Sequence, residues 1–285
     1  MDRQGRGCYG VAVKYIVHFT HDDELDAGVV RRYAEERGYW YRWVNIRSDL
    51  LETASIVKQS SMAVIWNGLQ YGGPLAARMC RRRGIPVCYF EWGFLPQPAT
   101  FSIDPCGFCG DSILSKDLSW VTDADLERLY QVRSELQQQY PLQKGSHILI
   151  PLQIENDTQI LYFSPYQNMG EFVADVEAMY PSTRIIARPH PRAKAKWTFA
   201  RAEVDGNGNF LEAAAKAGVV VGLTSTCLWE AAILGVHVVA LGDHPLRLQP
   251  KHLHDRVLAG ALALRIDRAT GDLGSVLDRL GIRPL

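Results

Sequence analysis

Residues 219–241 read VVVGLTSTCLWEAAILGVHVVAL, and they give the clearest indication of the fold class. A β-prone run, 219–223, leads into three hydroxyl residues, and a helical segment from Thr226 to Leu234 then ends at a glycine. A second β-prone run, 236–241, follows directly. Strand, helix and strand in this order are typical of the βαβ unit of a parallel sheet.

The same alternation extends over most of the chain in two series. Strands are expected at 15–19, 39–46, 62–66 and 87–90 in the first series, and at 147–152, 184–187, 219–223 and 236–241 in the second. Helices are expected at 26–38, 74–83, 172–179, 210–217 and 226–234. A segment rich in Glu, Gln, Leu and Arg, 117–139, reads as a helical connector. We therefore predict an α/β fold of two Rossmann-like halves, residues 1–140 and 141–285.

Composition narrows the class of protein. The chain has 285 residues, and 31 basic residues balance 31 acidic ones, so no overall field favours nucleic acid. No run approaches the ~18 apolar residues of a membrane span, and no apolar region follows Arg3 and Arg6 as in a secretory signal. We expect a cytoplasmic protein, with peripheral contact at the inner membrane or in an assembly complex left open.

Two of the six cysteines, Cys106 and Cys109, form a CxxC pair. A structural zinc site needs four ligands, and no second CxxC completes one. A redox pair would begin a helix after a strand, whereas residues 103–107 read as a turn. Ordinary loop thiols are the favoured interpretation, ahead of zinc and redox chemistry.

Ligands of open α/β sheets bind outside the carboxyl ends of the strands, so polar loops after strands are candidate sites. Glu91 follows the strand at 87–90, and Gly93 lets the backbone approach a ligand. The loop 153–159, with Gln153 and Asp157, follows another strand. Asp157 fits a nucleophile, a base or a helix cap equally well.

A third loop reads Arg188-Pro189-His190-Pro191-Arg192. Pro189 and Pro191 hold the backbone extended around His190. The two arginines supply cations that suit a phosphate or a carboxylate. A structural histidine in a proline turn is the alternative.

The hydroxyl cluster of the opening stretch predicts an anion site. Hydroxyls and free N–H groups at a helix N-terminus bind phosphate, which favours Ser225 and Thr226 as ligands of a nucleotide. Glu230 lies one turn further on the face of Thr226 and could accept from a ribose. A capped helix with a surface glutamate is the alternative.

Several known sites are absent from the sequence. No Walker GxxxxGK[ST] motif and no GxSxG elbow occur, and no GxGxxG follows the first expected strand. No Asp-X-Asp pair follows an expected strand either, so we expect no metal clamp. P-loop, dinucleotide-binding and hydrolase classes are disfavoured.

Taken in order, these loops resemble the capsule polysaccharide biosynthesis family. The resemblance covers about Trp66 to Leu241. It rests on Glu91-Trp92-Gly93 with Asp104 and Gly107, on Pro151-Leu152-Gln153 with Asp157, on His190-Pro191, and on Ser225-Thr226 with Glu230-Ala231. The better understood members look like retaining β-Kdo (3-deoxy-D-manno-oct-2-ulosonic acid) glycosyltransferases with a GT-B-like architecture.

The resemblance implies a role for each residue. Asp157 would be the nucleophile of a double displacement, Glu91 the acid/base, and His190 a contact to the donor phosphate or carboxylate. Ser225 and Thr226 would hold the phosphate of CMP-Kdo, and Glu230 its ribose. The remaining donor contacts are expected from Gln153, Arg188, Pro191 and Arg192.

The implied function is a metal-independent glycosyltransferase of capsule or lipopolysaccharide O-antigen synthesis. It would need no cofactor besides its donor substrate, CMP-Kdo, and its acceptor would be a glycan or a lipid-linked glycan. One alternative is a related transferase with another nucleotide-sugar and Asp157 as base. A second is a non-catalytic subunit that binds a nucleotide-sugar or glycan.

Overall fold

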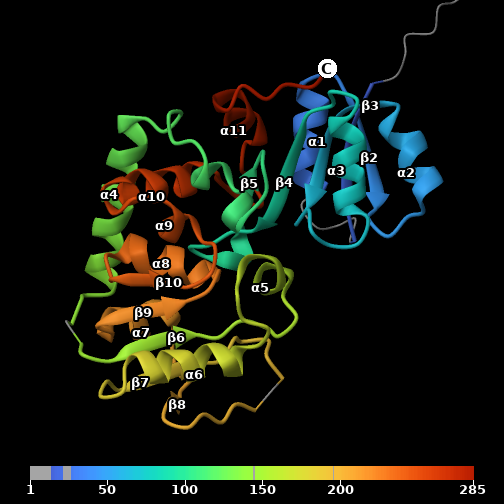
Figure 1. Ribbon diagram of the computed structural model, residues 1–285. Coiled ribbons are helices and arrows are strands. Elements are labelled where there is room, and N and C mark those ends of the chain that lie inside the picture. The colour runs from blue at the N-terminus through green and yellow to red at the C-terminus, as the bar shows by residue number, and fades with distance from the viewer. Residues whose placement is uncertain (1–13, 22–26, 144, 195) are drawn as a thin grey trace, which may run out of the picture.

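The computed structural model describes residues 14–21, 27–143, 145–194 and 196–285. It contains two β-sheets, each covered by helices, and the halves lie side by side (Figure 1). The α/β class with two Rossmann-like halves is confirmed. Within the described ranges, no helix has the length and apolar character needed to cross a membrane.

The first sheet has the strand order β11-β5-β4-β3-β1-β2. Its strands are β1 (Tyr15–Thr20), β2 (Trp40–Asn45), β3 (Ser60–Trp66), β4 (Val87–Trp92), β5 (Thr100–Asp104) and β11 (Arg265–Asp267). β1 to β4 are mutually parallel, whereas β5 and β11 add antiparallel. The flanking helices are α1 (Ala27–Glu36), α2 (Leu50–Val57) and α3 (Gly73–Arg81).

The second sheet has the order β10-β9-β6-β7-β8 and its described pairs are all parallel. Its strands are β6 (Ile148–Pro151), β7 (Ile185–Arg188), β8 (Glu203–Val204), β9 (Val219–Gly222) and β10 (Val238–Ala240). The associated helices are α5 (Thr158–Phe163), α6 (Met169–Met179), α7 (Phe210–Lys216), α8 (Thr226–Leu234) and α9 (Pro245–Leu248). If these five strands are numbered 1 to 5 along the chain, their order in the sheet is 3-2-1-4-5, as in a Rossmann fold.

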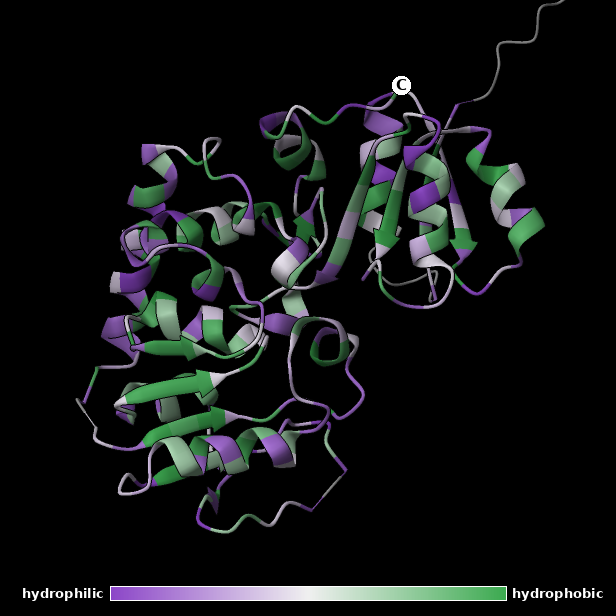
Figure 2. Ribbon diagram, viewed as in Figure 1, coloured by the Kyte–Doolittle hydropathy of each residue, from purple (hydrophilic) through white to green (hydrophobic). Residues whose placement is uncertain are grey.

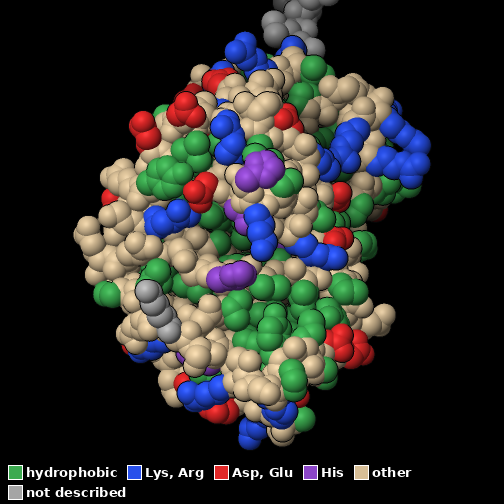
Figure 3. All heavy atoms as spheres, turned by 60° about the vertical axis from the view of Figure 1, so that its left-hand side comes forward, with side chains coloured by type: hydrophobic (Ala, Val, Ile, Leu, Met, Phe, Trp, Pro, Cys, Tyr) green, Lys and Arg blue, Asp and Glu red, His purple; other side chains and the backbone are tan. Residues whose placement is uncertain are grey.

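The strands are apolar and their neighbouring helices are apolar on the inner side, as Figure 2 shows by colour. Side chains alternate across the first sheet: Ile16, Val64 and Phe90 face one core, and Val17 and Ile65 face another. The face in Figure 3 carries acidic and basic side chains interspersed, in keeping with the balanced net charge.

The chain crosses between the halves more often than the predicted division at residue 140 allows. The helix before that point, α4 (Asp123–Gln139), packs against α8 and α10 (His254–Ala263). After α10 the chain returns to the first sheet, where β11 pairs with β5, and α11 (Leu273–Arg279) packs on α1. Residues 265–285 therefore belong spatially with the first half.

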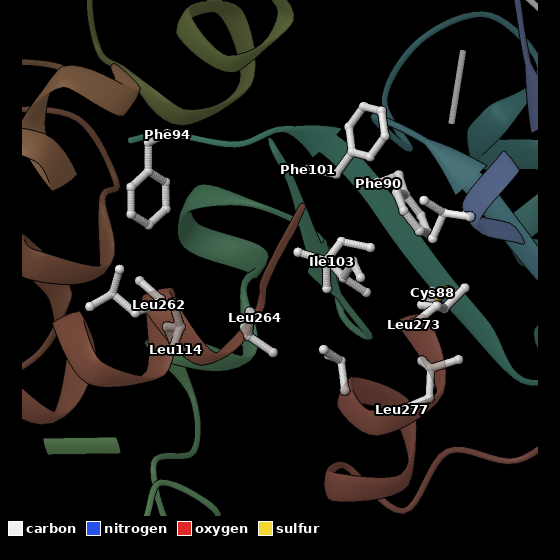
Figure 4. Close-up of a cluster of buried hydrophobic side chains, with 14 of the residues drawn as sticks. Cys88, Phe90, Phe94, Phe101, Ile103, Leu114, Leu262, Leu264, Leu273 and Leu277 are labelled. Atoms are coloured by element: carbon white, nitrogen blue, oxygen red, sulfur yellow. The ribbon is translucent and has the colours of Figure 1, made fainter. Parts of the chain in front are cut away.

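This return completes the first hydrophobic core. Figure 4 shows Phe90, Phe101 and Ile103 of the first sheet facing Leu273 and Leu277 of α11. The same cluster continues through Phe94, Leu114 and Leu262 toward the second half. One continuous hydrophobic core therefore contains side chains of both halves.

Candidate active site

A cleft of about 350 Å³ lies where loops of both sheets meet. Residues from the first half follow β1, β3 and β4, and those from the second follow β6, β7 and β9. In each sheet the order in which successive strands are added reverses beside these strands, between the parallel neighbours β1 and β3 and between β6 and β9. Such switch points are where open α/β sheets bind ligands. The lining residues are His21, Trp66, Asn67, Gln70, Glu91, Trp92, Gln97, residues 153–159, His190, Arg192 and residues 224–226.

Glu91 lies at the end of β4, part-buried in the cleft. The Asn67 amide donates to its Oε2 at 2.5 Å, and the Trp92 N–H donates to its Oε1 at 2.9 Å. Burial raises the pKa of Glu91 to about 7, and the nearby charge of Asp157 adds to the rise, although both hydrogen bonds oppose it. Glu91 can thus hold or release a proton near neutral pH.

Asp157 enters the same cleft from the second half. Its carboxylate caps α5 by accepting from the Gln159 N–H at 2.9 Å, so the cap interpretation is realised. Burial raises the pKa of Asp157, while the Gln159 N–H and the charges of His190 and Arg192 work against that rise. The residue is a cap and a cleft-facing carboxylate at once.

His190 and Arg192, from the loop after β7, also line the cleft. The Arg192 N–H donates to His190 Nδ1 at 3.1 Å. Burial lowers the pKa of His190, and Arg192 lowers it further, while Asp157 raises it. A neutral His190 with Nδ1 as acceptor carries its proton on Nε2, which can donate to a ligand.

The N-terminus of α8 closes the cleft with hydroxyl groups. Ser225 caps the helix and accepts from the Cys227 N–H at 3.2 Å. The buried Thr224 is held from both sides by Gln153, whose Oε1 accepts from its N–H at 3.1 Å and whose Nε2 donates to its hydroxyl at 3.1 Å. Thr226 is partly exposed and lines the cleft. The arrangement fits a phosphate group.

Three predicted ligands lie outside the cleft lining. Arg188 donates to the carbonyl oxygens of Asn207, at 2.7 Å, and Gly208. Pro191 is exposed. Glu230 is turned toward the first half, where its Oε1 accepts from the Leu95 N–H at 3.1 Å. Helical spacing could not show that the Leu95 N–H is the partner of the Glu230 carboxylate.

Sequence reasoning missed three contributors to the site. The Asn67 amide holds Glu91, and the Asn67 backbone has a left-handed φ of 57°. Gln159 fixes Asp157 and accepts from the Cys109 thiol at 3.2 Å. Trp92 packs edge-on to Trp66, with ring centroids 5.5 Å apart. Asn67 follows a strand, and that position was the available signal.

Asp104 organises the loop behind Glu91. Its carboxylate accepts from the Ser112 hydroxyl at 2.6 Å and from the N–H groups of Cys106, Gly107 and Ile113. Burial raises its pKa to about 6. Asp104 therefore acts as the anchor of a turn.

The acidic and sulfur groups form no recognisable metal centre in the described part of the chain, where no cluster of three or more His, Cys, Asp or Glu is placed to hold an ion. Asp123 and Asp125 have the DxD spacing but begin α4, where Asp125 forms a capping box with Thr122 and an ion pair with Arg279. Cys106 and Cys109 are both free thiols, and burial raises the pKa of each.

Comparison with known proteins finds similarity both in sequence and in structure. No protein-family model matches it. Protein FixF of Sinorhizobium fredii is 26% identical over 228 residues, which are 72% of this chain and 54% of that protein. The chain thus spans about half the length of this relative.

Two solved structures share the fold. Thermosulfurimonas dismutans KpsC, beta Kdo 2,7 transferase, matches with a TM-score of 0.63 and 20% identity over 86% of this chain and 89% of that one. Thermosulfurimonas dismutans KpsC, beta Kdo 2,4 transferase, matches with a TM-score of 0.62 and 15% identity over 94% and 98%. The two-domain GT-B-like architecture expected from the sequence agrees with both neighbours.

Proposed function

We propose that the protein is a glycosyltransferase of capsule-type surface polysaccharide synthesis that transfers Kdo from CMP-Kdo with retention. The observation that carries the proposal is the cleft itself. It brings Glu91 of one half and Asp157 of the other to a shared space beside the hydroxyl-lined N-terminus of α8. The fold shared with the two KpsC structures supports the choice of reaction.

The donor would lie between the two walls of the cleft. The phosphate of CMP would bind at Ser225 and Thr226, where N–H groups and hydroxyls converge. The Kdo carboxylate would pair with Arg192, because Arg188 already donates to two carbonyl oxygens. His190 would donate through Nε2 to the same anionic groups.

The reaction would proceed in two displacements. In the first, an Asp157 oxygen bonds to the anomeric carbon, and the bond from that carbon to the phosphate oxygen breaks as CMP leaves with the electron pair. In the second, Glu91 takes the proton of the acceptor hydroxyl, whose oxygen attacks the same carbon and releases Asp157. Two inversions give retention. The pKa of Glu91 near 7 suits this proton transfer.

A covalent adduct is the distinguishing product. Purified protein would be incubated with CMP-Kdo generated in situ, and its intact mass recorded for the wild type and for Asp157→Asn. We expect the wild type to gain the mass of one Kdo residue and the variant to gain none. Glu127→Gln, which changes an exposed carboxylate on α4 that does not line the cleft, serves as the control and should still form the adduct.

If the adduct hydrolyses too quickly to be detected by mass, the release of CMP from CMP-Kdo is measured instead. Wild-type protein that neither binds CMP nor releases it from CMP-Kdo would overturn the proposed donor. Release of CMP with inversion at the anomeric carbon would instead assign Asp157 the role of a base. The raised pKa of Asp157 gives that second mechanism its physical support.

A further inference from the structure

The starts of α2 and α3 carry a cluster of exposed apolar side chains, which we call the rim. Four of the thirteen large hydrophobic side chains that are exposed in the described part of the chain belong to it: Leu50, Leu51, Tyr71 and Leu75, with exposed fractions of 53%, 82%, 58% and 41%. Single exposed apolar residues are ordinary, whereas a cluster of them marks an interaction surface.

The two helix starts are tied together, so the four side chains form one surface. α2 and α3 pack side by side on the first sheet and follow mutually parallel strands, so both begin at the carboxyl ends of those strands (Figure 1). The Gly72 N–H donates to the Ile46 carbonyl oxygen at 3.0 Å, which joins the loop before α3 to the loop before α2. The Arg47 guanidinium lies 4.3 Å from the centroid of the Tyr71 ring and donates to the Tyr71 hydroxyl at 2.7 Å.

Cations lie behind the rim on the same faces of the two helices. Leu75, Arg78 and Arg82 are three and four residues apart, so they share one exposed face of α3. Leu51 and the exposed Lys58 are two turns apart and share one face of α2. At a rise of about 1.5 Å per residue, each cation lies about 4 to 11 Å behind the leucine of its own helix.

Carboxylates are scarce in this part of the first half. Residues 47–90 contain six cations and two carboxylates, in a chain whose total charges balance. Of the two carboxylates, Asp49 is engaged as the N-cap of α2, where it accepts from the Glu52 N–H at 2.8 Å. Within the described ranges, none of the three cations behind the rim forms an ion pair. Their charge is therefore available to an anionic partner.

An apolar tip with cations one to two turns behind it matches the layers of an anionic bilayer. The headgroup layer of one leaflet is about 5–7 Å thick, and apolar side chains of peripheral proteins enter a bilayer by about 5–10 Å. Leucine side chains that reach the acyl boundary would thus hold the cations at the depth of the lipid phosphates. Tyr71 suits this boundary, because its ring is apolar and its hydroxyl is polar.

We propose that the rim docks the protein on the surface of an anionic phospholipid bilayer, with the leucines inserted and the cations on the lipid phosphates. The inference goes beyond the proposed reaction and does not depend on it. Gln70 lines the cleft, and the next residue, Tyr71, belongs to the rim. Docking through the rim therefore brings the cleft close to the membrane, where a lipid-linked acceptor of the proposed reaction would be held.

The test is flotation with unilamellar vesicles of phosphatidylcholine alone and of phosphatidylcholine with about one third phosphatidylglycerol. We expect the wild type to bind the anionic vesicles at least about tenfold more tightly than the neutral ones, and less tightly in high salt. Leu51→Gln combined with Leu75→Gln should weaken this binding by about tenfold or more, because two apolar side chains no longer insert. Lys58→Gln combined with Arg78→Gln and Arg82→Gln should weaken it about tenfold to hundredfold.

Matched variants away from the rim separate its contribution from general effects. Leu142→Gln combined with Leu248→Gln removes two leucines whose exposed fractions, 42% and 44%, are close to that of Leu75. Arg128→Gln combined with Lys251→Gln and Arg283→Gln removes three exposed cations and so gives the same net charge as the triple variant behind the rim. Both controls should bind the anionic vesicles as the wild type does.

Failure of the wild type to bind the anionic vesicles would overturn the inference. Equal binding to neutral vesicles would do so too, and so would an equal loss in the rim variants and their controls. Analytical ultracentrifugation tests a second copy of the chain as the occupant. A wild-type dimer that the double leucine variant dissociates would make the rim a subunit interface and overturn the inference. CMP binding is recorded on the wild type, and its absence there would count against the proposed function alone.

Discussion

At the residue scale, the raised pKa of Glu91 makes the free energy of unfolding depend on pH. Its pKa of about 7 lies above the ordinary value of 4.5, because the fold disfavours the charged form. Below pH 4.5 the carboxyl is protonated in both states and costs nothing. Between pH 4.5 and pH 7 only the folded state retains the proton, so the free energy of unfolding falls by about 3 kcal/mol over this range and then levels off.

Glu91→Gln should remove this loss. We expect the free energy of unfolding of the variant to rise relative to the wild type between pH 5 and pH 8, by about 2 kcal/mol. Urea denaturation at a series of pH values measures it. Glu35→Gln, an exposed change on α1, is the control and should follow the wild type. Parallel stability curves for Glu91→Gln and wild type would contradict the assignment.

Sequence position predicted which residues share the cleft better than it predicted their contacts. Glu91, Asp157 and His190 each follow a strand, and the carboxyl ends of parallel strands meet at one edge, so their proximity could be expected. Their chemical roles stay predictions. The partners of Arg188 and Glu230 could not be read from the sequence, because residues 95 and 207–208 reach them only through the tertiary fold.

At the element scale, α8 combines a helix cap with the proposed phosphate site, and the two roles can be separated. Thr226→Val removes a hydroxyl from the cleft but leaves the Ser225 cap in place. We expect CMP affinity to fall about threefold to tenfold, with little change in stability. Isothermal titration with CMP measures the first, and thermal unfolding the second.

The matched control for α8 is the cap of α7. Asn209 accepts from the Leu211 N–H at 2.7 Å and does not line the cleft. Asn209→Ala should cost about 1 kcal/mol of stability and leave CMP affinity unchanged. If both variants affected CMP affinity alike, the effect would come from general loosening of the second half.

The sequence predicted the strands and helices that carry a signal within a short window of residues. The strands and helices of the two βαβ series follow from apolar periodicity and glycine stops. β5 was missed because Asp104 and Pro105 read as a turn, and α2 because it is a single short helix after Asp49. β11 forms by pairing with a strand more than 150 residues earlier, which no local window contains.

At the scale of the whole molecule, we expect the packing of α11 to stabilise both halves, because α11 contributes to the core that they share. Leu277 is fully buried in the core that also holds Phe90 and Ile103. Leu277→Ala should cost about 2–5 kcal/mol. The measurement is urea unfolding followed by circular dichroism, with the exposed Leu161→Ala as the control, expected within about 0.5 kcal/mol of wild type. A loss as small as that of the control would mean that α11 is not part of the cooperative unit.

Glu230 joins the two halves through one hydrogen bond. It accepts from the Leu95 N–H, and beside it Phe94 stacks on Trp229 with ring centroids 6.1 Å apart. Arg265 donates to the carbonyl oxygen of Phe94 at 3.0 Å, which ties the returning strand to the same segment. Burial raises the pKa of Glu230. Because the site is buried, removal of the Glu230 carboxylate would leave the Leu95 N–H desolvated and without an acceptor.

Glu230→Ala should therefore lower the free energy of unfolding by about 1–3 kcal/mol, because the joint between the halves loses its buried acceptor. Glu212→Ala, which breaks only the exposed pair with Lys216, should cost less than about 0.5 kcal/mol. CMP titration of the same variants tests the predicted ribose contact. A tenfold loss of affinity in Glu230→Ala would mean that the nucleotide binds the Glu230 carboxylate oxygen that accepts from the Leu95 N–H in this structure. Donor binding would then open the joint as it forms the site. Unchanged affinity would leave Glu230 as a joint alone, holding the segment beside Glu91 in place.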